Sequence, residues 1–276
     1  MNEENQDQTS DFQRENQPNN TEWQAPPPPE RILKTDEQPQ MSEVGTLGSI
    51  FFEPGATFED LRRKPRFLLA GLIMVALFAA FIVAFNSKLG FERIARERLE
   101  SSSWYQNQSS EQKETTLRQQ TSPVVKGITY AVAPLAFLFT LLIGGLIYWL
   151  GANAMGGSAT FLRGLAVWIY SSFPPMVVSM LANLLVLFLK SADDIDPVAS
   201  QNGLVHASPA FFVDAKTSPV LNALLGTFDV FYIWGWILAA IGLRIVGKIS
   251  TGAAWAIVLF VALFNVVTRV LGALFS

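Results

Sequence analysis

The stretch FLLAGLIMVALFAAFIVAFNS, residues 67–87, decides the fold class of this 276-residue chain. It carries no charged side chain over 21 residues. At about 1.5 Å per residue, a helix of this length crosses the hydrocarbon core of a bilayer. The four bases of RRKPR, residues 62–66, stand immediately before it. This arrangement predicts a transmembrane helix with a positively charged flank.

Four more apolar segments follow, and together with the first they predict five transmembrane helices. Residues 127–162 lack charge and are too long for one helix, but the small, polar loop GANAMGGS at 151–158 divides them. Each of the last two segments contains a single charge, Asp229 or Arg269. The predicted spans are residues 67–87, 127–150, 164–189, 220–243 and 253–275.

The N-terminal segment has a different character. Residues 1–47 hold ten acids and three bases, whereas the rest of the chain carries a net charge of +4. Because few apolar residues are present to offset the entropy of ordering, residues 1–46 are predicted to be a disordered tail, ahead of a five-helix unit at 47–276. The four prolines at 26–29 favour polyproline II, either as a stiff spacer or as a docking motif for an aromatic groove.

Shorter amphipathic segments flank the first span. Residues 47–61 are too poor in apolar residues to cross a bilayer and contain the turn signal Pro54-Gly55, which predicts a segment lying at the membrane surface. The polar loop after the first span is predicted to form two surface helices. Ser109 and Gln112 form a capping-box pattern at the start of the second one. The fold class is therefore an all-α integral membrane bundle with short surface helices.

The composition excludes several chemistries. The chain has no cysteine, which removes disulfides and thiolate sites, and its one histidine, His206, falls in a predicted irregular loop at 190–219. A metal site with two or three histidines from one chain is therefore impossible. The paired membrane carboxylates of an intramembrane protease are missing as well, because Asp229 stands alone. A net charge of −3 gives no basic face for nucleic acid. We expect no enzyme, no cofactor and no metal.

The basic residues of the chain give conflicting indications of how the protein is oriented in the membrane. With a cytoplasmic N-terminus, seven bases flank the spans inside and nine outside, against the positive-inside rule. The four bases beside the first span, which usually dominates orientation, favour the cytoplasmic N-terminus. An acidic N-terminal segment without a signal peptide also favours it. We therefore expect the N-terminus inside and the C-terminus outside.

Asp229 is predicted near the middle of the fourth span, where an isolated charge costs about 2.5–3.5 kcal/mol. It could pair with Arg269 and hold two helices together, or it could line a proton or substrate path. In a third interpretation Arg269 snorkels outward while Asp229 is neutral and hydrogen-bonded. Pro174 and Pro175 predict a kink or a local break in the third span, which is either architectural or part of a transporter site.

Three groups of motifs carry a resemblance to a known family. They are LGSIFFEPGATF at 47–58 with RKPR at 63–66, MGGSATF at 155–161 with YSSFP at 170–174, and FDVFYIW at 228–234 with IGL at 241–243. In this order and spacing they resemble the bacterial branch of the Yip-domain family, the Ypt/Rab-interacting integral membrane proteins. The resemblance covers roughly residues 47–275.

The resemblance implies five transmembrane helices, a cytosolic N-terminus and, for a bacterial chain, the cytoplasmic membrane. Eukaryotic members are associated with vesicle trafficking and Rab-type GTPases as scaffolds or adaptors, and the family supplies no catalytic residues to transfer. Our candidate functional or structural positions are Gly156, Gly157, Phe161, Tyr170, Pro174, Pro175, Asp229, Trp234 and Arg269.

Two functional hypotheses follow. In the first, the protein is a non-enzymatic scaffold or adaptor that organises the bilayer and contacts protein partners through its tail and residues 51–61. In the second, it transports a small solute or a lipid with the help of Asp229 and a broken third span. Small residues on the helix faces would also allow an oligomer, and no nucleic-acid partner is expected.

Overall fold

The structure is a computed structural model that describes residues 38–205, 207–213 and 217–274. Most of the predicted tail and His206 lie outside these ranges. The described part of the chain is helical and contains no strand. Its α-helices are α1 (Glu43–Phe52), α2 (Pro54–Arg63), α3 (Leu68–Leu89), α4 (Phe91–Glu100), α5 (Ser103–Gln106), α6 (Ser110–Gln120), α7 (Pro123–Ala154), α8 (Phe161–Leu189), α9 (Pro219–Leu225), α10 (Val230–Gly247) and α11 (Thr251–Leu274).

Five of the described helices, α3, α7, α8, α10 and α11, are long and apolar enough to cross a membrane. This confirms the predicted fold class, an all-α integral membrane protein. The polar loop after α3 forms three helices rather than the predicted two, because the short α5 lies between α4 and α6. The expected capping box of Ser109 and Gln112 is present at the start of α6.

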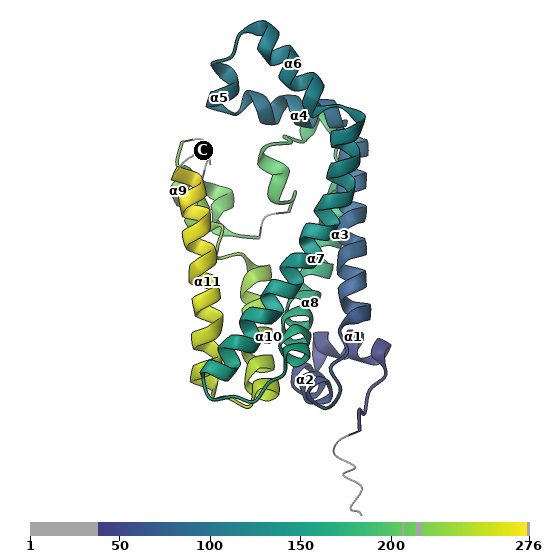
Figure 1. Cartoon of the computed structure of the whole chain (residues 1–276), viewed down its shortest axis with the longest axis vertical. Coiled ribbons are helices and arrows are strands. Elements are labelled where there is room, and N and C mark those ends of the chain that lie inside the picture. The colour runs from purple at the N-terminus through teal and green to yellow at the C-terminus, as the bar shows by residue number, and fades with distance from the viewer. Residues whose placement is uncertain (1–37, 206, 214–216, 275–276) are drawn as a thin grey trace, which may run out of the picture. The chain divides into compact units, whose positions relative to one another are not determined.

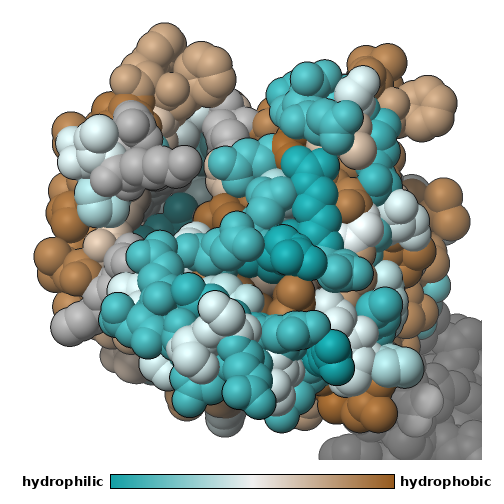
Figure 2. Space-filling model, turned by 90° about the horizontal axis from the view of Figure 1, so that it is seen from above, coloured by the Kyte–Doolittle hydropathy of each residue, from teal (hydrophilic) through white to brown (hydrophobic). Residues whose placement is uncertain are grey.

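The chain runs back and forth between two ends of the bundle (Figure 1). One end holds α1, α2, the turn from α7 to α8 and the turn from α10 to α11, and we call it the α1–α2 end. The opposite end holds α4, α5 and α6, and we call it the α4–α6 end. Figure 2 looks onto the α4–α6 end and shows hydrophilic residues across it, with hydrophobic residues around the sides. This is the distribution expected where a bundle emerges from a bilayer.

Glycines set the close contact between α7 and α8. A Cβ atom on Gly145 would lie 2.7 Å from the Cα atom of Leu165, and one on Gly164 would lie 2.8 Å from the carbonyl oxygen of Gly145. A Cβ atom on Gly144 would overlap the Trp168 indole. Small residues allow membrane helices to approach until their backbones touch, which strengthens dispersion contacts. These glycines therefore serve contacts inside the chain rather than a free oligomer face.

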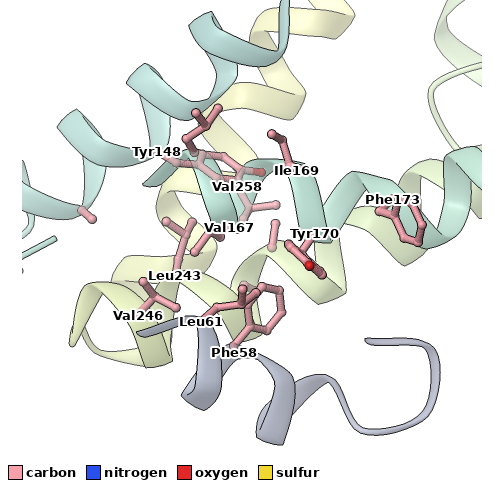
Figure 3. Packing of buried hydrophobic residues seen from close by; sticks show 14 of the residues in the cluster. Phe58, Leu61, Tyr148, Val167, Ile169, Tyr170, Phe173, Leu243, Val246 and Val258 are labelled. Atoms are coloured by element: carbon pink, nitrogen blue, oxygen red, sulfur yellow. The ribbon is translucent and has the colours of Figure 1, made fainter. Parts of the chain in front are cut away.

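The helices α1 and α2, which cover the segment predicted at the membrane surface (residues 47–61), pack against the end of the bundle. Ile50, Phe58 and Leu61 are fully buried. In Figure 3 the side chains of Phe58 and Leu61 point from α2 toward Val167 of α8 and toward α10. Their burial also removes them from the predicted partner surface at residues 51–61. Phe52, which is 87% exposed, remains on the outside.

The third span is unbroken. α8 continues through Pro174 and Pro175, and both prolines are buried. Proline removes a backbone donor, so the carbonyl groups one turn earlier lose their helical partners. Gly235 of α10 lies against this point, since a Cβ atom built on it would be 3.6 Å from the Ser171 carbonyl oxygen and 3.7 Å from Pro175 Cγ. Close packing by a neighbouring helix is one of the ways in which membrane helices tolerate proline.

Candidate functional site

The nine candidate residues do not form one site. Gly156, Gly157 and Phe161 lie at the turn between α7 and α8, at the α1–α2 end. Tyr170, Pro174, Pro175 and Trp234 lie where α8 and α10 meet α1. Asp229 and Arg269 lie toward the α4–α6 end of α10 and α11.

The turn between α7 and α8 depends on its glycines. Gly156 has a positive φ of 82°. The N–H of Gly157 donates a hydrogen bond to the Ala152 carbonyl at 2.9 Å and so caps the end of α7. A Cβ atom on Gly157 would lie 2.5 Å from the carbonyl oxygen of Gly247, the last residue of α10. The N–H of Ser158 donates to the same carbonyl at 3.2 Å. The Gly-Gly motif therefore joins this turn to the end of α10.

Tyr170 and Trp234 help to hold α1. The ring of Phe51, near the end of α1, packs edge-on against Trp234 and Phe173, with centroid separations of 6.1 and 6.2 Å. Tyr170 is 1% exposed and lies beside the fully buried Thr46 of α1. Aromatic pairs of this kind contribute about 0.5–1.5 kcal/mol beyond their buried area. These motif residues act here as a receptor for α1 within the same chain.

A buried ion pair fastens the chain just before α1. The carboxylate of Asp60 accepts hydrogen bonds from Arg66 and from the backbone N–H groups of Gln40 and Met41. Arg66 in turn donates to the Met41 carbonyl at 2.5 Å. The two charged side chains are only 2% and 9% exposed. We call these four residues the clasp.

The sequence did not reveal the clasp. The bases at 62–66 indicate only a membrane flank, and the partners of Asp60 lie about twenty residues away along the chain. Asp60 and Arg66 are six residues apart, which is not the spacing of three or four residues that pairs charges on one helix. A second cation at this end, Arg163, donates from Nε to the Arg62 carbonyl at 3.0 Å and so links α8 to α2.

Asp229 does not lie within a span, which corrects the predicted boundary of 220–243. The predicted helix is divided into α9 and α10, and Asp229 is the N-cap of α10. One carboxylate oxygen accepts from the Phe231 N–H at 2.8 Å, and the other accepts from the Ala207 N–H at 3.1 Å. The Val230 N–H donates to the Ala207 carbonyl at 3.1 Å. Asp229 therefore fixes the loop that returns from α8.

Two asparagines near the α4–α6 end serve the same loop. Asn183 of α8 accepts from the backbone N–H groups of Leu204 and Val205. Asn222 of α9 donates to the carbonyl groups of Ala210 and Val213. Backbone groups held near a bilayer need protein partners because lipid offers none. These asparagines satisfy loop backbone rather than forming the network between helices that polar residues in spans suggest.

Arg269 does not pair with Asp229. Among the residues that the structure describes, no carboxylate lies within 4.0 Å of its guanidinium. Arg269 Nε donates to Asn265 Oδ1 at 2.9 Å, and Nη2 donates to the Tyr232 hydroxyl at 2.6 Å. Of the three interpretations of Asp229, the ion pair with Arg269 is therefore not the one that the structure has. A cation–aromatic contact with a hydrogen bond takes its place.

The role of Asp229 predicts a graded mutant series. Asp229→Ala should lower the free energy of unfolding by about 1 kcal/mol, the usual effect of losing an N-cap. It should also free the loop at Ala207. Asp229→Asn should stay close to wild type because asparagine caps helices well. This chain has no cysteine, so a cysteine placed at position 207 can be labelled selectively. Its rate of reaction with a thiol reagent measures how exposed the loop is in wild type, Asp229→Ala and Asp229→Asn. Equal rates in all three proteins would exclude the contact between Asp229 and the loop.

The family model of the Yip1 domain matches residues 48–271. The chain belongs to the Yip1-domain family. Membrane protein YknW of Bacillus subtilis (strain 168) is 31% identical to it over 221 residues, covering 79% of this chain and 87% of YknW. No solved structure matches. The resemblance of the sequence motifs to this family is thus confirmed.

Membership of the Yip1-domain family indicates a membrane protein and no enzymatic family. In the described residues, no three His, Asp or Glu side chains gather as metal ligands would. The arrangement described above holds elements together: a glycine turn, an aromatic receptor for α1, a clasp and a capped loop. The clasp differs from the others because it binds the backbone of residues 40 and 41, ahead of α1.

Proposed function

We propose that this Yip1-domain protein is a non-enzymatic scaffold of the bacterial cytoplasmic membrane that presents its N-terminal tail to protein partners. The observation that carries the proposal is the clasp. Asp60 and Arg66 bind the backbone of residues 40 and 41, so the tail that precedes them is attached to a fixed point of the bundle. An anchored tail raises the local concentration of a bound partner at the membrane.

The proposal places the α1–α2 end in the cytoplasm. The four bases at residues 62–66, in the last turn of α2 and just before α3, lie at this end. Arg163, Arg244 and Lys248 flank the α7–α8 and α10–α11 turns at the same end. Short basic segments directly beside spans are the charges that count most for orientation. The acidic tail then emerges where cytoplasmic proteins can reach it.

The transport hypothesis started from a broken third span and a carboxylate in the middle of the fourth. Because α8 is continuous and Asp229 caps α10, neither feature now supports transport. The scaffold proposal depends on neither of them. It requires only a stable bundle and a tail that leaves it at a defined place.

The test separates the tail from the clasp. Deleting residues 1–37 removes the tail and leaves Gln40 and Met41 in place, whereas deleting residues 1–46 removes the clasp partners as well. We expect the first deletion to abolish recovery of cross-linked partners while the protein inserts and unfolds like wild type. A matched control replaces residues 1–37 with a Gly/Ser-rich segment of equal length. Unchanged recovery of the same partners after the first deletion would exclude the proposal.

A further inference from the structure

Three polar side chains meet on the faces of α10 and α11 toward the α4–α6 end. The guanidinium of Arg269 stacks over the ring of Tyr232, with Cζ 5.1 Å from the ring centroid. The side-chain oxygen of Asn265, one turn earlier on α11, accepts a hydrogen bond from Nε of the guanidinium at 2.9 Å. The Tyr232 hydroxyl accepts from Nη2 at 2.6 Å. Both neighbours fix the orientation of the cation, but neither neutralises it.

The positive charge of Arg269 is unpaired in the described part of the chain. Asp229, the acid three residues before Tyr232, accepts hydrogen bonds from the N–H groups of Ala207 and Phe231 instead. No hydrogen bond within the described residues engages Nη1 of Arg269. The Tyr232 hydroxyl, which accepts from the guanidinium, still has its own proton to donate. The pair therefore offers donors to an anion and carries no negative charge that would repel it.

The surroundings of this pair are those of a lipid boundary. Arg269 stands about 27 Å along α11 from Thr251, counted at 1.5 Å per residue, so it lies near the far limit of a core of about 30 Å. Tyr232 is 44% exposed, and Phe228 and Val230, just before it in the chain, are 59% and 60% exposed. The pair therefore lies beside a segment with exposed apolar side chains.

We propose that Arg269 and Tyr232 bind the phosphate of a phospholipid in the leaflet at the α4–α6 end. Arginine suits this ligand because its planar donors match two phosphate oxygens at once, and the Tyr232 proton can serve a third contact. This inference is independent of the scaffold proposal.

Native mass spectrometry of the full-length protein, released from nanodiscs of phosphatidylglycerol and phosphatidylethanolamine, tests the site. We expect wild type to retain a bound phospholipid. Arg269→Gln should lower its occupancy by about tenfold, the scale of one charge-assisted hydrogen bond. Tyr232→Phe removes one donor and should lower lipid occupancy by about threefold. This second variant tests the site even if Arg269→Gln does not fold. Arg118→Gln in the exposed α6 is the matched control and should change nothing.

Arg269→Lys separates a phosphate site from a simple membrane anchor. Lysine snorkels as well as arginine but binds phosphate as a point charge, without the planar pair of donors. Reduced lipid occupancy in Arg269→Lys supports the proposal, whereas occupancy equal to that of wild type overturns it. The mass of the bound molecule distinguishes a phospholipid from inorganic phosphate. A protein that carries inorganic phosphate from the buffer but no phospholipid would also overturn the proposal.

Discussion

Replacing Asp60 with alanine should lower the free energy of unfolding by about 3–5 kcal/mol, the usual effect of removing one partner of a buried ion pair. The variant leaves Arg66 charged and 9% exposed, and it leaves the N–H groups of Gln40 and Met41 without their acceptor. Chemical unfolding in mixed micelles measures the loss. Tryptophan fluorescence follows it, because Trp234 packs against Phe51 of α1.

Two further variants make this expectation specific to the clasp. Glu59→Gln removes the neighbouring ion pair to Arg62, which is partly exposed, and should cost less than about 1 kcal/mol. The double variant Asp60→Leu with Arg66→Met removes both buried charges. It should recover much of the lost stability, because a buried ion pair can often be replaced by apolar residues of similar volume. If Asp60→Ala were no more harmful than Glu59→Gln, the clasp would contribute little.

Gly145→Val should separate α7 from α8 and lower stability by about 1–3 kcal/mol or more, the range for overpacked cores. The first carbon of the new side chain would lie 2.7 Å from the Cα atom of Leu165. Backbone cannot move aside as the end of a flexible side chain can. Thermal unfolding in detergent measures the effect, and trapping of the variant as aggregate during purification would report the same clash.

Gly127→Val is the matched control for this substitution. It lies on the same helix, and a Cβ atom there meets no atom within 4 Å. The two variants share the change in helix propensity, so the difference between them isolates the packing of α7 on α8. Equal melting temperatures would mean that the two helices can repack around a larger residue, against the close contact described here.

Much of the fold could be predicted because a bilayer imposes a simple rule. A span needs about 20 apolar residues, and such runs are visible in the sequence without any knowledge of contacts. The small, polar residues at 151–158 and the capping residues are also local signals, although α7 continues to Ala154 before it turns. The fourth span was misplaced because residues 219–243 are almost uniformly apolar. Hydrophobicity alone does not reveal that the chain breaks between Leu225 and Val230.

The candidate residues came from sequence motifs, and their contacts could not be read from spacing. Tyr170 and Trp234 are 64 residues apart and meet through α1, which the sequence placed on the membrane surface. Asp229 looked like a membrane carboxylate because its partner, the N–H of Ala207, is a backbone group in a distant loop. A backbone donor carries no signal in the sequence.

The sequence by itself therefore determined the class of protein, the five apolar helices and the family. These follow from composition and from local order along the chain. Only the tertiary structure decided that α1 and α2 belong to the core, that Asp60 and Arg66 hold the segment before α1, and that Arg269 meets Tyr232 rather than Asp229. The physical reason is that ion pairs, caps and glycine contacts depend on distances in space between residues far apart in the chain.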